Sequence, residues 1–209
     1  TYTELRHSPV ISARLHALSE VAATVGAAQI QNRGTIGGNI CNASPAGDTL
    51  PVLLAVDAVF ECASTTGVRE VPVREFWTGY RQTALRDDEL LVRIRFVVDR
   101  ARHTRYRKVG TRAAQAISKV VIALSYREDE EVWRDVRVAL GSVAPTTIRA
   151  AATEAVLEGT RPGEAVADEA ARVLAEEIKP IDDVRSTADY RRSVSARVLH
   201  RLLRQEGGW

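Results

Sequence analysis

The spacing of apolar positions predicts helices at both ends of the chain and strands between them. Over 12–25, apolar residues recur at three- and four-residue steps behind Ser12, which is typical of a capped amphipathic helix. A second helix is expected over 49–55. Two β-rich runs, 58–63 and 68–73, lie on either side of a short turn and predict a hairpin. The first half therefore combines helices with antiparallel strands.

The pattern continues with strands and then changes to helices. Residues 90–98 alternate polar and apolar side chains, which predicts a strand with one buried face. The run 117–126 is apolar on both faces, so we expect it at the centre of a three-stranded antiparallel sheet with 105–111 and 132–143. Beyond Pro145 the composition shifts to Ala, Glu and Arg. Three helices are predicted there, over 150–158, 164–177 and 188–204.

Composition and charge exclude several classes of protein. Of the 209 residues, 45% are apolar and 27% charged, which is typical of a globular protein. The formal net charge is only +2 and the basic residues are dispersed, which disfavours nucleic-acid binding. The longest uncharged apolar stretch is interrupted and too short to cross a membrane. Two cysteines and four scattered histidines predict a reducing, cytoplasmic location and no metal site in this chain.

The candidate chemistry lies in a segment rich in glycine and small polar residues, 29–48. The adjacent Gly37 and Gly38 lack Cβ atoms, so they allow positive φ angles and let a ligand approach main-chain N–H groups, as in diphosphate sites that use no Lys or Arg. The alternative is an ordinary tight turn between a strand and a helix. The spacing matches neither G-x-G-x-x-G nor a Walker loop, which disfavours a classical Rossmann domain.

This segment resembles the second flavin motif of the FAD-binding subunits of molybdenum hydroxylases. The matching residues are 31–40 (QNRGTIGGNI), followed by Ala43-Ser44-Pro45 and Asp48. Later segments resemble the family in the same order, at 76–81 with 89–91, at 108–112 and at 116–120. The family includes the flavoproteins of xanthine dehydrogenase and aerobic carbon monoxide dehydrogenase. The resemblance covers nearly the whole chain.

The resemblance implies a role for ten residues, all as contacts to FAD. Thr35, Ile36, Gly37, Gly38 and Asn39 would contact the diphosphate, and Asn42 and Asp48 would lie near the ribityl chain and the flavin. Leu90 and Leu91 would pack on the flavin or the adenine, and Lys108 would lie near the ring. Without the resemblance, the favoured interpretation of Lys108 is a solvated charge on an edge strand, and that of Asp48 is a helix N-cap, which is compatible with a role near the flavin. Trp77 and Tyr80 are candidates for a protein interface or for ordinary core packing.

The fold implied is α+β, in two parts. Residues 1–98 would form the second FAD-binding subdomain, and 102–209 the C-terminal flavoprotein domain, an antiparallel sheet with a helical layer. The chain contains no Met and begins at Thr1, after the place of the family's first FAD subdomain. We therefore expect the other wall of the FAD cleft to come from another chain, a cleaved segment or an omitted part.

The function implied is electron transfer within an oxidoreductase complex. FAD would carry electrons from 2Fe-2S clusters in an iron–sulfur small subunit to a soluble acceptor, while a large subunit with the molybdenum cofactor oxidises the substrate. The alternative is a flavin-free scaffold or interaction subunit of the same kind of complex. A flavin in the purified protein would distinguish the two.

Overall fold

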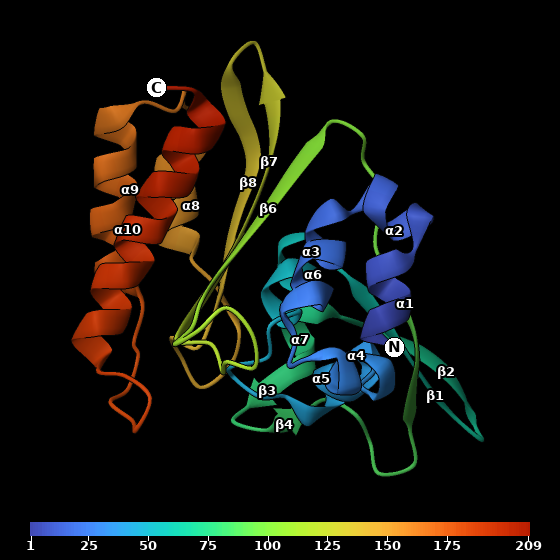
Figure 1. Ribbon diagram of the computed structural model, residues 1–209. Coiled ribbons are helices and arrows are strands. Elements are labelled where there is room, and N and C mark those ends of the chain that lie inside the picture. Colours follow the sequence, from blue (N-terminus) through green and yellow to red (C-terminus); the bar gives the residue numbers. More distant parts are fainter.

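The computed structural model describes residues 1–209 (Figure 1). It has two lobes: residues 1–95 form the first, and residues 102–209 form the second, whose antiparallel sheet packs against the first lobe on one face and carries a layer of helices on the other. The first lobe holds the helices α1 (Tyr2–His7), α2 (Pro9–Arg14), α3 (His16–Thr24), α4 (Ala28–Arg33), α5 (Ile36–Asn42), α6 (Leu50–Ala55) and α7 (Val73–Phe76). Its strands are β1 (Val59–Ser64), β2 (Gly67–Pro72), β3 (Trp77–Gly79), β4 (Gln82–Thr83) and β5 (Leu90–Arg95). The remainder comprises β6 (Arg102–Val109), β7 (Val120–Asp129), β8 (Val132–Gly141), β9 (Ile148–Arg149), α8 (Ala151–Leu157), α9 (Glu164–Glu177) and α10 (Ala188–Gly207).

The helix predicted over 12–25 is two helices, α2 and α3, so that prediction is wrong in its extent. The first helix begins earlier, because the Ser8 hydroxyl caps it by accepting from the Ile11 N–H at 3.3 Å and Pro9 occupies the first turn. The chain leaves helical geometry at Leu15, with φ −150° and ψ 70°. This break buries the Leu15 side chain, which is 5% exposed.

The glycine-rich segment is largely helical, in α4 and α5. The Thr35 hydroxyl caps α5 by accepting from the Gly38 N–H at 3.0 Å. Gly37 and Gly38 lie inside that helix without positive φ, and the left-handed residue is Ala43, with φ 46°, at its end. The conformational freedom expected of the two glycines is therefore unused, and only their small size matters here.

The hairpin predicted in the first lobe is confirmed as β1 and β2, and β5 extends it to a three-stranded sheet of order β2-β1-β5. The strict alternation expected along β5 is wrong because the strand carries a bulge. Glu61 pairs with Arg93 and the next residue, Cys62, pairs with Leu91, which leaves Val92 between them. As a result Leu91 packs against the core, whereas Val92 is 55% exposed.

The second sheet has the order β6-β7-β8-β9, so the central place predicted for 117–126 is confirmed by β7. The short β9 adds a fourth strand to the expected three. Alternate residues of β7 enter different cores: Val121 and Ala123 pack with the first lobe, and Ile122 and Leu124 pack under the C-terminal helices. This double burial explains why the sequence of β7 is apolar on both faces.

The C-terminal helices α8, α9 and α10 form a layer on the face of the sheet opposite to the first lobe (Figure 1). The helix predicted over 164–177 is confirmed with the same bounds, and those over 150–158 and 188–204 are confirmed with small shifts at their ends. In the first lobe, Trp77 packs edge-on against Phe60 and Phe76 and donates its indole N–H to the Ile40 carbonyl at 3.1 Å. Trp77 is thus a core residue, while Tyr80 is 63% exposed.

Candidate functional site

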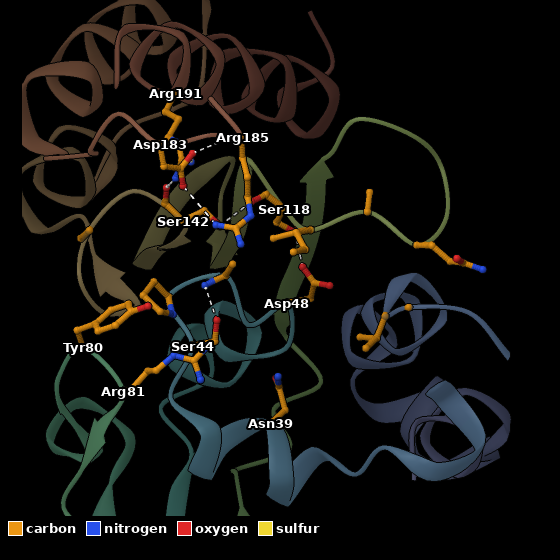
Figure 2. A pocket seen from close by; sticks show the side chains of 18 of the residues that line it. Asn39, Ser44, Asp48, Tyr80, Arg81, Ser118, Ser142, Asp183, Arg185 and Arg191 are labelled. Atoms are coloured by element: carbon orange, nitrogen blue, oxygen red, sulfur yellow. Dashed lines mark hydrogen bonds and ion pairs between the residues drawn. The ribbon is translucent and has the colours of Figure 1, made fainter. Parts of the chain in front are cut away.

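The main cavity, of about 950 Å³, lies where connections of the first lobe face connections of the second sheet (Figure 2). The first lobe contributes the connection from α3 to α4, the segment 44–48 before α6, and the turn between β3 and β4. The opposite wall is made by residues 115–118, by the loop after β8 and by the segment leading into α10. The cavity is therefore built mostly from loops, to which α4, α5 and α10 add a few helical residues.

A buried ion pair joins the two walls. The Lys108 ammonium on β6 lies 2.7 Å from the carboxylate of Asp48, and each side chain is only 10% exposed. Lys108 also donates to the Thr24 carbonyl at 2.9 Å, and the Ser118 hydroxyl donates to the second oxygen of Asp48. Asp48 and Ser118 line the cavity, whereas Lys108 lies behind Asp48. The pair holds three segments, from both lobes, around one carboxylate.

The surroundings of Asp48 disfavour its charge. Burial raises the pKa of the Asp48 carboxyl, and the charge of Lys108 and the hydrogen bonds from Lys108 and Ser118 counteract only part of this increase. Burial and the nearby Asp48 also raise the pKa of Tyr106, whose hydroxyl lies 3.0 Å from the Thr24 hydroxyl. The negative charge of Asp48 therefore depends on its bonds to Lys108 and Ser118.

The residues of α5 divide between the cavity and its edge. Asn39 lines the cavity, and its amide oxygen accepts from the Thr49 hydroxyl at 2.6 Å. Asn42 does not line it, but its amide oxygen accepts from Arg81, which does, at 3.1 Å. The first turn of α5, with Thr35, Ile36, Gly37 and Gly38, lies outside the lining. An added Cβ on Gly37 would meet no atom within 4 Å, so this turn leaves open space for a ligand.

Leu90 and Leu91 also lie outside the cavity lining. Leu90 is 72% exposed at the start of β5, while Leu91 is half-buried and packs against the first core. The structure therefore brings Asn39, Asp48 and Lys108 together and leaves the two leucines at a separate surface.

Sequence reasoning missed the residues on the α10 side of the cavity. Asp183, Arg185 and Arg191 line it there, and Figure 2 shows them opposite Tyr80 and Arg81. Burial opposes the shift, but the backbone N–H of Arg185 and the guanidinium of Arg191 hold the pKa of Asp183 below its ordinary value. No local sequence pattern marks these three residues as part of a site. They reach the cavity only because the chain passes through the helical layer and comes back to it before α10.

The cavity has the properties of a flavin site. Its volume is near the upper end of the range of about 300–1,000 Å³ that is usual for ligand pockets. Apolar side chains such as Val25, Ile30 and Ile117 line it together with uncharged hydrogen-bonding groups, a combination that suits a flat ring with polar edges. The buried guanidinium of Arg191 adds a positive charge to this wall, which suits a ligand that carries phosphate groups. The residues present therefore fit FAD.

Two family models match the two halves of the chain. The FAD binding domain in molybdopterin dehydrogenase matches residues 1–96, and the CO dehydrogenase flavoprotein C-terminal domain matches residues 105–205. Together with the cleft, these matches define an FAD-binding subunit of oxidoreductase type.

Relatives and solved structures agree with these matches. The medium chain of carbon monoxide dehydrogenase from Hydrogenophaga pseudoflava is 32% identical, with 96% of this chain and 70% of the relative covered. The putative xanthine dehydrogenase FAD-binding subunit of Escherichia coli K12 is 29% identical, over 100% of this chain and 73% of the relative. A carbon monoxide dehydrogenase structure from H. pseudoflava superposes with a TM-score of 0.91 at 31% identity, over 96% of this chain and 70% of that one. The chain belongs to the FAD-binding subunits of the molybdenum hydroxylases.

None of the helices combines the length and the apolar character needed to cross a bilayer.

Proposed function

We propose that this chain passes electrons from iron–sulfur centres through FAD to a soluble acceptor in the cytoplasm. The observation that carries the proposal is the cavity between the two lobes, because each lobe matches a flavoprotein family model and residues of both line the cavity. When bound, FAD supplies reversible two-electron chemistry that can also proceed in single-electron steps, which suits a carrier between iron–sulfur clusters and a two-electron acceptor.

The residues of this chain would bind and orient the flavin. We propose that the open first turn of α5, with Thr35, Ile36, Gly37, Gly38 and Asn39, approaches the diphosphate, and that Asn42 and Asp48 lie by the ribityl chain and the ring. Leu90 and Leu91 would offer an apolar surface to the adenine or the flavin. Lys108 would act through Asp48, because its ammonium lies behind that carboxylate. Residues 1–98 and 102–209 would act as the two domains.

Partners would complete both the electron path and the cleft. The name of one relative is that of a medium chain, and we propose that this chain likewise assembles with an iron–sulfur small subunit and a large subunit that carries the molybdenum cofactor. A first FAD subdomain, in the same or another chain, would cover the exposed first turn of α5 and the exposed Leu90.

Coexpression with the two partner subunits tests the proposal. We expect a heteromeric complex on size-exclusion chromatography, a visible flavin spectrum, and bleaching of that spectrum when the iron–sulfur subunit is reduced. A complex that assembles without flavin would instead support the scaffold function. Elution of this chain alone, with flavin that substrate fully reduces, would leave no role for the partners.

A further inference from the structure

The end of the cavity near α10 carries positive charge that is not balanced within the protein. Three arginines and two aspartates line the cavity, and one of the aspartates, Asp48, is already paired with Lys108. The other, Asp183, contacts both Arg191, at 2.7 Å, and Arg185, at 3.4 Å, so one positive charge at this end has no counter-ion. With Arg81 on the opposite wall, the lining of the cavity carries two positive charges without a counter-ion.

Arg191 is a buried positive charge, held in place by hydrogen bonds, at this end of the cavity. Its side chain leaves α10 at 5% exposure and donates to the Ser142 carbonyl at 2.6 Å and to Asp183 at 2.7 Å. Its Nε is buried without a partner, although the residue lines the cavity. Because this Nε is closed off from the cavity, Arg191 contributes a buried positive charge to this end and not a free donor.

Arg81 and Arg185 are exposed and approach the cavity from opposite walls (Figure 2). Arg81 donates to the amide oxygen of Asn42 and has no carboxylate partner. The contact of Arg185 with Asp183 is long, so most of its donors are available. Guanidinium forks match the geometry of phosphate oxygens and bind them in pairs of charge-assisted hydrogen bonds.

We propose that Arg81 and Arg185, with the buried charge of Arg191 behind them, form a subsite for the phosphate groups of the soluble electron acceptor, which would be a nucleotide-type molecule. This inference rests on the proposed function. The α10 end is separate from the open first turn of α5, where we place the diphosphate of FAD. An acceptor held by its phosphates at the α10 end would extend along the cavity toward Asp48, and hence toward the flavin ring.

Reoxidation of the flavin in the assembled complex tests the proposal. The reduced flavin is mixed in a stopped-flow instrument either with NAD⁺, which carries a diphosphate and accepts a hydride, or with the uncharged quinone menadione, which accepts two electrons and two protons. For R81Q and R185Q we expect the second-order rate constant with NAD⁺ to fall about tenfold or more, because each change removes a charge-assisted contact. The rate constant with menadione should change less than about twofold, because that acceptor has no phosphate for these arginines to bind. The matched control is R201Q, since Arg201 is an exposed arginine of α10 outside the cavity.

A binding measurement provides a readout that does not depend on turnover. Isothermal titration of the oxidised complex with ADP-ribose, which has the diphosphate but no nicotinamide, should show binding to the wild type and to R201Q and weaker binding to R81Q and R185Q. Equal slowing with both acceptors, or no binding of ADP-ribose to the wild type, would overturn the proposal. Loss of FAD from R185Q would also overturn it, because these arginines would then hold the diphosphate of FAD itself. Failure of the iron–sulfur subunit to reduce the flavin would instead count against the proposed function.

Discussion

Replacing Lys108 with Met tests whether the ion pair with Asp48 joins the two lobes. The change keeps most of the length of the side chain but leaves the Asp48 carboxylate buried without its cation. Removing one partner of a buried pair typically costs about 3–5 kcal/mol, and with both side chains 10% exposed we expect a loss of about 3 kcal/mol in the free energy of unfolding at pH 7. Urea denaturation followed by circular dichroism measures this loss.

The pH dependence of the K108M penalty separates charge from packing. Burial already raises the pKa of Asp48, and removing Lys108 raises it further. The native variant therefore binds a proton more tightly than its unfolded chain does, so it gains stability relative to the wild type as the pH falls through this raised pKa. The penalty should shrink between pH 7 and about 5, since a neutral carboxyl costs far less to bury.

A double-mutant cycle completes the test. D48N/K108M removes both charges, so its cost should be less than the sum of the two single changes by more than about 1 kcal/mol. An equal penalty for K108M at pH 7 and pH 5, together with additive single changes, would show that the pair is solvated and that only packing was lost.

Three further changes test other parts of the molecule. G37V should reduce FAD content in the assembled complex without lowering the melting temperature, because its Cβ meets no protein atom; the control is G163V in the C-terminal helical layer, which should retain FAD. Full FAD content in G37V would show that FAD does not approach α5 closely. E89Q should flatten the dependence of the free energy of unfolding on pH, because the hydrogen bonds from Arg69 lower the pKa of Glu89 to about 2. The stabilisation by ionised Glu89 is therefore present above about pH 4.5 and is lost as the pH falls toward 2, so an acid unfolding curve by circular dichroism that E89Q leaves unchanged would contradict this. D57N keeps a residue suited to the left-handed φ of 48° but weakens the ion pairs with three arginines. We expect the free energy of unfolding to fall by about 1 kcal/mol in low salt and by almost nothing near 1 M salt, and a decrease independent of salt in urea titrations would refute an electrostatic origin.

Sequence patterns succeeded where a residue's surroundings are set by its neighbours in the chain. The helix at 164–177 and the central position of β7 follow from periods of 3.6 and from apolar character on both faces. The bulge at Val92 and the break at Leu15 could not be predicted in this way, because each depends on how a strand or helix meets the first core. Gly37 and Gly38 show the same limit. Their composition indicates a loop, but the Thr35 cap starts a helix that includes both glycines.

The sequence by itself determined the α+β class, the helical end of the chain and, through its ordered motifs, the flavoprotein family. Only the tertiary structure decided which of the ten candidate residues share one site: Asp48 meets Lys108 across 60 positions of sequence, while Leu90 and Leu91 lie elsewhere. It also decided that Arg185 and Arg191 line the same cavity as Tyr80 and Arg81. The physical reason is that helix periods and caps depend on residues close together in the sequence. A cleft between two lobes instead depends on how segments far apart in the sequence pack together.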